Sequence, residues 1–455
     1  MLPADIKTAA DARAIVEARG LSHVKVGVSD LDGVMRGKYM AAEKFFSALG
    51  GGFGFCDVVL GWDSNDQAYD NTSFTGWHTA YPDVLCRVLP PTCRPIPIED
   101  GMLFFLAEFA GRGEDICPRG ILRRVLARAD AMGFAVTAAA EFEFFVFEET
   151  PQSAREKNYR NLKTLTPGNF GYSILRAGAQ HGFYRDLLAM CEDMRMPIEG
   201  LHTETGPGVL EAAIKYSGAL EAADRAALFK TFTKIFSQKR GLMATFMAKW
   251  SRDVPGQSGH LHLSLKDKSG KPVFHDASAP HAISQTMRHF IGGQQALMPE
   301  LLAMVASTIN SYTRLIPGFW APTVSAWGIE NRTTALRVIP GPPQSQRVEY
   351  RVAAADINPY LALAAAIASG LWGIEHRIEP DAPVSGNAYD KKFPAKRQLP
   401  RSLGAAAEKF RASKPARALF GEAFVDHYAA TREWEVREHA KAITDWQLQR
   451  YFEII

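Results

Sequence analysis

The chain has 455 residues, of which 47% are hydrophobic and 22% charged, and its formal net charge is +3. This length exceeds what one ordinary core supports, so we expect two domains. The acidic and basic residues are interspersed, which gives neither a basic stripe for nucleic acid nor a polybasic membrane patch. We therefore expect neither a nucleic-acid partner nor a membrane partner.

The cysteines and the apolar segments favour a cytoplasmic protein. The five cysteines are odd in number and never form a Cys-x-x-Cys pair, which predicts reduced thiols. Residues 1–20 alternate apolar and charged residues at helical spacing and contain no signal-peptide core. The most apolar run, residues 359–374, is shorter than the ~20 residues that span a bilayer, so we predict a core helix there.

Taken in chain order, the elements divide into two parts. Short strands separated by turn residues are predicted at 24–28, 34–40 and 84–88. A polar joint at 111–117 precedes a helix predicted at 118–132, which opens with proline. We predict a small β-rich domain over residues 1–113 and an α+β domain over residues 114–455.

The strand predicted at residues 140–147 carries Glu141 and Glu143 on one face of an otherwise aromatic sequence. Two like charges on one face repel each other and push one carboxyl towards protonation. A divalent cation would neutralise them, because hard cations bind carboxylate oxygens. The alternative is an edge strand with a solvated glutamate face.

Two further segments place possible ligands together. Glu204 and Glu211 lie on either side of a Gly-Pro-Gly turn, which can fold both carboxylates towards one point, although a surface loop is the alternative. The strand predicted at residues 259–265 places His260, His262 and Ser264 on one face. Imidazole is a good metal ligand, and a hydroxyl suits a nucleotide. Satisfied core histidines are the alternative.

The segment from residue 331 to 351 collects four arginines around one glutamate. Its last residues alternate charged and apolar side chains, which predicts a strand with its charges on one face. An isolated buried charge costs on the order of 20 kcal/mol in the idealised limit, so these charges need each other, an anion or a metal. Guanidinium groups match carboxylate and phosphate oxygens. The charged residues are Arg332, Arg337, Arg347, Glu349 and Arg351.

Together these clusters are what a metal–nucleotide site requires, and their order resembles that of the bacterial-type glutamine synthetase family. The matching motifs are Glu-x-Glu-Phe-Phe, the two glutamates around the turn, Gly-His-x-His-x-Ser-Leu, Arg-Leu-x-Pro-Gly, Asn-Arg-x-x-x-x-Arg and Arg-x-Glu-x-Arg. They cover nearly the whole chain.

The resemblance implies an amino-terminal β-grasp domain and a large catalytic domain with a curved antiparallel sheet. It also implies ring oligomers, commonly dodecamers of two hexameric rings, in which the neighbouring subunit's amino-terminal domain closes each active site. The implied reaction joins the γ-carboxylate of L-glutamate to a small amine through γ-glutamyl phosphate. ATP is the co-substrate, with two or three Mg²⁺ or Mn²⁺ ions per site.

The resemblance also assigns roles to residues. The first metal would be held by Glu143, Glu204 and Glu211, and the second by Glu141, His260 and Glu349. ATP would be bound by His262, Ser264, Arg337 and Arg347, and glutamate by Arg314, Arg351 and Gly256. The catalytic residues would be Asp57, Tyr172, Glu204 and Arg332. Asp63 and Asp66 are alternatives to Asp57, because the residues after Asp57 depart from the family pattern.

One departure concerns residues 317–322, the loop that corresponds to the lid of glutamine synthetases. Where glutamine synthetases carry a glutamate in a Pro-Gly-x-Glu-Ala-Pro pattern, residues 317–322 of this chain place Trp320. Tryptophan cannot bind ammonium by charge or take its proton, but it can pack on a larger amine or offer a cation–π face. With Tyr172 it would line an amine pocket. We therefore expect a γ-glutamylpolyamine or γ-glutamylmonoamine synthetase.

Two other interpretations remain open from the sequence: a glutamine synthetase that uses ammonia despite its altered lid, and a non-catalytic relative that binds nucleotide or forms a structural ring. The amine ligase would belong to amine catabolism, whereas the glutamine synthetase would belong to nitrogen assimilation. Tyr389 lies near the position where some relatives are adenylylated, and we predict an exposed loop tyrosine there.

Overall fold

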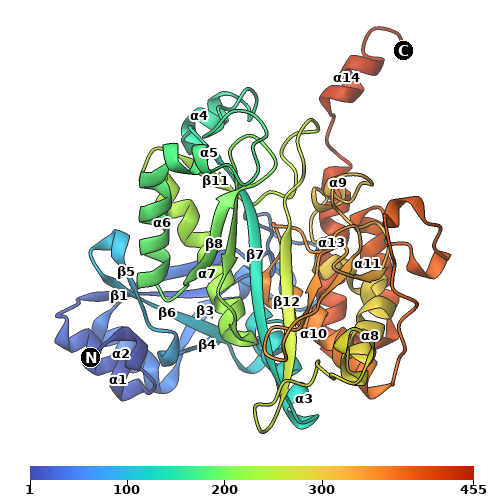
Figure 1. The fold of residues 1–455 in the computed structure, drawn as a ribbon. Helices are drawn as coiled ribbons and strands as arrows, with labels where there is room; N and C mark the ends of the chain where they lie inside the picture. Colours follow the sequence, from blue (N-terminus) through green and yellow to red (C-terminus); the bar gives the residue numbers. More distant parts are fainter.

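The computed structural model describes residues 1–455 and contains two separate β-sheets (Figure 1). The first sheet belongs to the amino-terminal part and has the order β2-β1-β6-β4-β3, with β5 paired to β6. Helix α1 (Ala9–Ala18) precedes this sheet and helix α2 (Ala42–Gly51) follows its second strand. The strands are β1 (His23–Ser29), β2 (Met35–Ala41), β3 (Phe53–Cys56), β4 (Asp83–Val88), β5 (Arg94–Ile96) and β6 (Met102–Phe109).

The second sheet has the order β13-β14-β15-β12-β7-β9-β8, and two short strands, β10 and β11, also pair with β7. The long strands β7 and β12 run side by side through the middle of the molecule (Figure 1). The strands are β7 (Phe134–Phe147), β8 (Ile198–Thr203), β9 (Val209–Ile214), β10 (Ser217–Gly218), β11 (Met243–Thr245), β12 (Gly259–Asp267), β13 (Trp327–Ile329), β14 (Leu336–Ile339) and β15 (Arg347–Tyr350).

Helices cover one face of this sheet. Phe142 and Phe144 of β7 pack on Phe229 of α7, with ring centroids 6.5 and 5.8 Å apart. The opposite side chains of β7, including Glu141 and Glu143, therefore face away from the helical layer. The longer helices are α3 (Pro118–Ala131), α6 (His181–Asp193), α7 (Ala219–Gln238), α8 (Gln285–Leu301), α10 (Pro359–Glu375), α11 (Leu403–Ala412) and α13 (Glu422–His439).

Five shorter helices complete the fold: α4 (Pro151–Glu156), α5 (Ile174–Ala179), α9 (Ser311–Arg314), α12 (Lys414–Phe420) and α14 (Asp445–Tyr451). Helix α14 stands apart from the body at the carboxyl end (Figure 1). None of the helices combines the length and the apolar character that crossing a bilayer requires.

The α+β class and the curved sheet are confirmed, with two corrections. The second sheet, predicted to be antiparallel, contains one parallel pair, β13 with β14. Helix α2 was not predicted within the β-rich region. Its apolar residues Phe45 and Ala48 are buried at helical spacing, and the helix ends at Gly52, whose φ of 75° suits glycine.

Candidate active site

The predicted ligands come together because four neighbouring strands, paired in the order β15-β12-β7-β9, are in register. In the β7–β12 pair Glu141 lies opposite His260, and in the β7–β9 pair Glu143 lies opposite Glu211. In the β12–β15 pair His262 lies opposite Glu349. Since β7 lies between β12 and β9, the alternative of an edge strand with solvated glutamates does not hold.

Glu349 is buried among cations. Its Oε1 lies 3.3 Å from His260 Nδ1 and also contacts Arg351, and its Oε2 accepts a hydrogen bond of 2.9 Å from Arg337. Burial works against ionisation here, but the charges of His260 and Arg351 outweigh it and lower the pKa of Glu349 to about 2. This carboxylate is therefore a permanent anion at the floor of the site.

Glu141 contacts both histidines of β12. Its Oε1 lies 3.1 Å from His262 Nε2, and its Oε2 lies 3.9 Å from His260 Nδ1. Although burial opposes it, the two imidazoles hold the pKa of Glu141 well below its usual value. Possible ligand atoms of Glu141, His262 and Glu349 all lie within 4.8 Å of one another. The structure thus brings His262, predicted for the nucleotide, as close to this group as His260, predicted for the metal.

A second group lies one strand further along the sheet. Glu143 accepts a 2.6 Å hydrogen bond from the Ser258 backbone N–H. Burial and the charge of Glu211 raise the pKa of Glu143 to about 8. Glu204 and Glu211 lie with His202 in a group whose ligand atoms are all within 4.8 Å of one another.

His202 was missed by the sequence reasoning. Its Nε2 lies 3.3 Å from Glu211, and the Tyr172 ring stacks on its imidazole with centroids 4.4 Å apart. Although burial opposes it, the hydrogen bond to Glu211 raises the pKa of His202 to about 9. The sequence spacing could have indicated it, because His202 precedes Glu204 by two residues and side chains two apart in a strand share a face.

These donors fit divalent cations. The first group offers two carboxylates and two imidazoles, and the buried His260 Nε2 has no hydrogen-bond partner. The second group offers the carboxylates of Glu204 and Glu211 with one imidazole, and Glu143 lies opposite Glu211 in the β7–β9 pair. Oxygen and imidazole nitrogen donors are what Mg²⁺ and Mn²⁺ accept in proteins.

Some of the predicted arginines contact other site residues, and one does not. Arg337 and Arg351 both contact Glu349, and Arg347 Nε donates to His262 Nδ1 at 3.1 Å. Arg332 is exposed and forms no ion pair. Ser264 is half-buried on β12 without a side-chain hydrogen bond.

Arg314 is buried behind this group, only 4% exposed. Its guanidinium donates to the carbonyl oxygens of Val352 and Arg351 at 3.0 and 3.1 Å. A Cβ at Gly256 would lie 2.7 Å from the Arg314 side chain, so only glycine leaves it room. The structure therefore places Gly256 against the predicted glutamate-binding arginine.

The lid follows Arg314 directly. Residues 317–322 carry Phe319 and Trp320, which are 44% and 62% exposed, and Trp320 has a φ of 58°. Lys249 Nζ lies 4.8 Å from the Phe319 ring centroid. Trp320 and Tyr172, predicted to line an amine pocket, are both exposed, and no direct contact joins them in this chain.

Asp57 is not brought to this site by its own chain. It is fully buried in the amino-terminal domain, where Thr75 Oγ1 donates to it at 2.5 Å and Arg112 pairs with it at 3.3 Å. Despite these partners, burial raises the pKa of Asp57. Asp57 begins a 3₁₀ turn, Asp57–Leu60, with its side chain buried.

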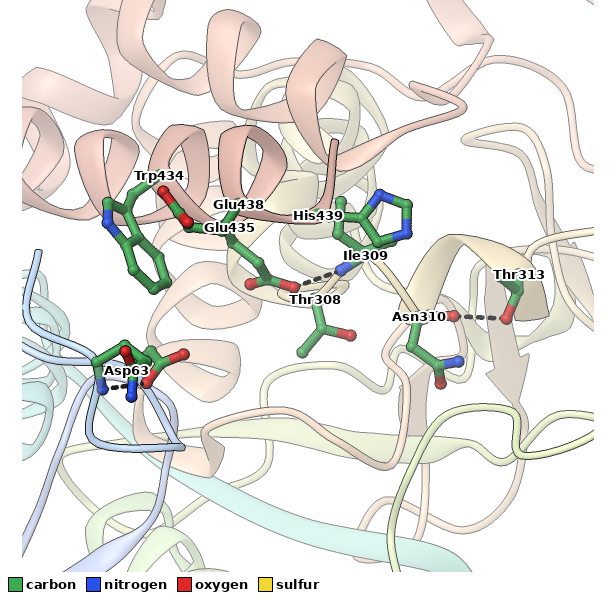
Figure 2. A pocket seen from close by; sticks show the side chains of 10 residues that line it. Asp63, Thr308, Ile309, Asn310, Thr313, Trp434, Glu435, Glu438 and His439 are labelled. Atoms are coloured by element: carbon green, nitrogen blue, oxygen red, sulfur yellow. Dashed lines mark hydrogen bonds between the residues drawn. The ribbon is translucent and has the colours of Figure 1, made fainter. Parts of the chain in front are cut away.

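The two alternatives to Asp57 also lie elsewhere. Asp66 pairs with Arg36 at 2.6 Å. Asp63 lines a cavity of about 550 Å³ between the amino-terminal part and helix α13, together with Trp434 and Glu435 (Figure 2). None of the residues predicted for metal, ATP or glutamate lines this cavity.

The prediction that Tyr389 is an exposed loop tyrosine also needs correction. Tyr389 is half-buried, and its hydroxyl donates to the Ala321 carbonyl oxygen at 3.1 Å. An exposed loop tyrosine was expected because residues 380–400 are rich in proline and lysine. That composition does not reveal that the loop folds back onto the lid.

Paired carboxylates and imidazoles beside arginines offer donors that suit divalent cations and phosphate. Residues 115–451 match the glutamine synthetase catalytic domain. The chain belongs to the glutamine synthetase family and is a carbon–nitrogen ligase, so the non-catalytic interpretation is set aside. ATP and divalent metal ions serve this family generally.

Two relatives by sequence and one solved structure show which proteins the chain is similar to. The type-1 glutamine synthetase 2 of Dictyostelium discoideum is 47% identical over 95% of this chain and 84% of its own length. The glutamate–isopropylamine ligase of a Pseudomonas species is 36% identical over 97% of each chain. A solved structure described as apo GmaS without ligand has a TM-score of 0.84 and 26% identity, covering 97% of this chain and 99% of that one.

Proposed function

We propose that the protein ligates the γ-carboxylate of L-glutamate to a small organic amine, with ATP supplying the energy. The observation that carries this proposal is Trp320, which occupies the exposed lid position where the family pattern has a glutamate. The similarity to a glutamate–isopropylamine ligase over 97% of both chains supports it.

The site fits activation of a carboxylate. Glutamate would be held by Arg314 and Arg351, with Gly256 leaving space beside Arg314. Its γ-carboxylate oxygen would attack the terminal phosphorus of ATP and give γ-glutamyl phosphate and ADP. Arg332, free of any ion pair, would meet the phosphoryl group in transfer, with Arg337 and Arg347 at the phosphates. His262 and Ser264 would contact the nucleotide.

Two groups would hold the divalent ions: Glu143, Glu204 and Glu211 for one, and Glu141, His260 and Glu349 for the other, with His202 and His262 adjacent. When bound, such ions neutralise phosphate charge. The neutral amine then attacks the acyl carbon, the bond to phosphate breaks, and the extra proton on nitrogen passes to a base. This yields a γ-glutamylamide.

A ring of subunits would complete this site. The hydrogen bond and ion pair of Asp57 are made with Thr75 and Arg112 and not with the acidic groups of its own chain, and the rim beside Tyr172 exposes apolar side chains. A neighbouring amino-terminal domain would cover this rim, in a dodecamer of two hexamers, and would supply Asp57 once Thr75 and Arg112 move off its carboxylate. The exposed residues are Phe170, Tyr172, Ile174 and Leu175. The five unpaired cysteines support a cytoplasmic setting.

The test is phosphate release from ATP with Mg²⁺ and glutamate against ammonium, methylamine, ethanolamine, isopropylamine, putrescine and spermidine. We expect one organic amine to exceed ammonium in kcat/KM. Turnover with ammonium alone, unimproved by any amine, would support the second candidate, a glutamine synthetase. That candidate is favoured by the 47% identity to the Dictyostelium enzyme.

A further inference from the structure

The segment from residue 384 to 390 touches the lid. The Tyr389 hydroxyl donates to the carbonyl oxygen of Ala321, which is fully buried at the end of the lid. The aromatic ring of Tyr389 lines a small cavity of about 120 Å³ together with Pro317 at the start of the lid. Both ends of the lid therefore adjoin this one tyrosine.

The same segment is fixed to the turn that carries Arg332. Asn331 Nδ2 donates to the carbonyl oxygens of Val384 and Gly386 at 3.0 and 2.9 Å. Thr333 Oγ1 accepts the Ala388 backbone N–H at 2.9 Å. Residues on both sides of Arg332 are thus bonded to the segment that holds the lid.

We propose that the Tyr389 hydroxyl is a latch that couples the lid over the amine pocket to the Arg332 turn, so that the lid stays closed while the activated glutamate waits for its amine. This rests on the proposed function. Tyr389 is a positioning residue, since it acts through Ala321 and the lid backbone. Three hydrogen bonds fix the segment to the turn and one fixes it to the lid, which makes Tyr389 the contact most easily released.

The phenol is suited to this role. Burial raises the pKa of Tyr389 although Arg351 and Arg314 are near enough to oppose the shift. The hydroxyl therefore keeps its proton at neutral pH and donates it to the carbonyl. Arg314 itself lies only three residues before the lid, so a change in lid position is also close to the glutamate site.

An open lid would admit water to the acyl phosphate. Water oxygen would attack the acyl carbon, the bond to phosphate would break, and glutamate and phosphate would be regenerated. ATP would then be consumed without amide. The ratio of phosphate released to amide formed measures this loss directly, and it does not respond to a simple loss of folded protein.

The experiment compares the full-length wild type with Tyr389→Phe, using whichever nitrogen substrate the wild type accepts. We expect a rise in KM for that substrate of about 3- to 10-fold, as for one lost hydrogen bond, and a phosphate-to-amide ratio above one. KM for ATP should stay unchanged. An unchanged KM for the nitrogen substrate and a ratio of one would overturn the latch.

Three further variants distinguish a latch from a nonspecific effect of the substitution. Thr333→Val removes the acceptor of the Ala388 N–H beside Tyr389 and should also raise the ratio, whereas Thr333→Ser keeps the hydroxyl and should not. Tyr216→Phe is the matched control, because Tyr216 is 58% exposed and its hydroxyl makes no hydrogen bond. If the wild type prefers ammonium, the proposed function fails while the ratio still decides on the latch.

Discussion

The floor and the lid of the site are built differently. The floor consists of titratable side chains on β7, β9, β12 and β15 that strand register fixes, and ion pairs support several of them, as Arg337 and Arg351 support Glu349. The lid consists of six residues with two exposed aromatic rings and few contacts. The floor is suited to chemistry shared by a family, and the lid can change without disturbing the sheet.

This comparison predicts that residues of the site differ in how far activity and stability can be separated. Arg332 belongs to neither a strand nor an ion pair, so the fold does not depend on it. Arg337 donates a 2.9 Å hydrogen bond to the buried Glu349, so the fold does depend on Arg337.

The largest effect is expected for Arg332→Ala. If Arg332 stabilises the phosphoryl group in transfer, kcat should fall about 1000-fold or more, while the thermal unfolding temperature stays within about 1 °C of the wild type. Steady-state kinetics and differential scanning fluorimetry measure the two quantities. Arg401→Ala, another exposed arginine without an ion pair, is the control and should change neither. A fully active Arg332→Ala enzyme would remove this residue from the mechanism.

The next effect concerns the lid. Trp320→Glu restores the charge that the family pattern carries, and its positive φ is no worse for glutamate than for tryptophan. We expect the ratio of kcat/KM for ammonium over that for the preferred organic amine to rise by at least about 10-fold.

Trp320→Phe keeps an apolar face and serves as the control, with a ratio close to that of the wild type. Equal ratios in all three enzymes would show that the lid does not select the amine. The floor would then have to be searched for the selecting residue.

The floor could be predicted from the sequence, because charged residues alternate with apolar ones in Glu141–Phe142–Glu143 and in Arg347–Val348–Glu349. Period-two alternation fixes which side chains share a face, whatever the rest of the chain does. Strand order was not readable from these motifs. It decides that His262 lies beside Glu141, and that His202 joins Glu204 and Glu211.

The lid contacts could not be predicted for a different reason. Tyr389 and Ala321 are 68 residues apart; Tyr389 lies in a single 3₁₀ turn, Ala388–Asp390, and Ala321 lies in a loop. A single hydrogen bond between two loops leaves no pattern in the sequence. The same holds for the burial of Asp57, which depends on Thr75 and Arg112 folding over it.

The last prediction tests the floor through the proton on Glu143. Glu143 has a pKa of about 8 in the metal-free fold, against 4.5 in an unfolded chain. Between these values the folded protein holds a proton that the unfolded chain has lost, so this group makes stability fall as pH rises from about 4.5 to 8. A divalent cation replaces that proton.

Apparent Mg²⁺ affinity should therefore weaken about fifty-fold between pH 8 and pH 6, as expected for displacing one proton from a group of this pKa. The measurement is the rise in unfolding temperature on adding Mg²⁺ to chelator-treated protein at each pH. Glu143→Gln has no proton to displace at this position and should flatten the dependence, whereas Glu199→Gln, at an exposed glutamate of β8, should not. A proton displaced from His202, whose pKa is about 9, would add the same slope in both enzymes, so the difference between wild type and Glu143→Gln measures the Glu143 proton. A wild-type response independent of pH would mean that the cation does not displace the Glu143 proton, and the first metal would have to be assigned to other ligands.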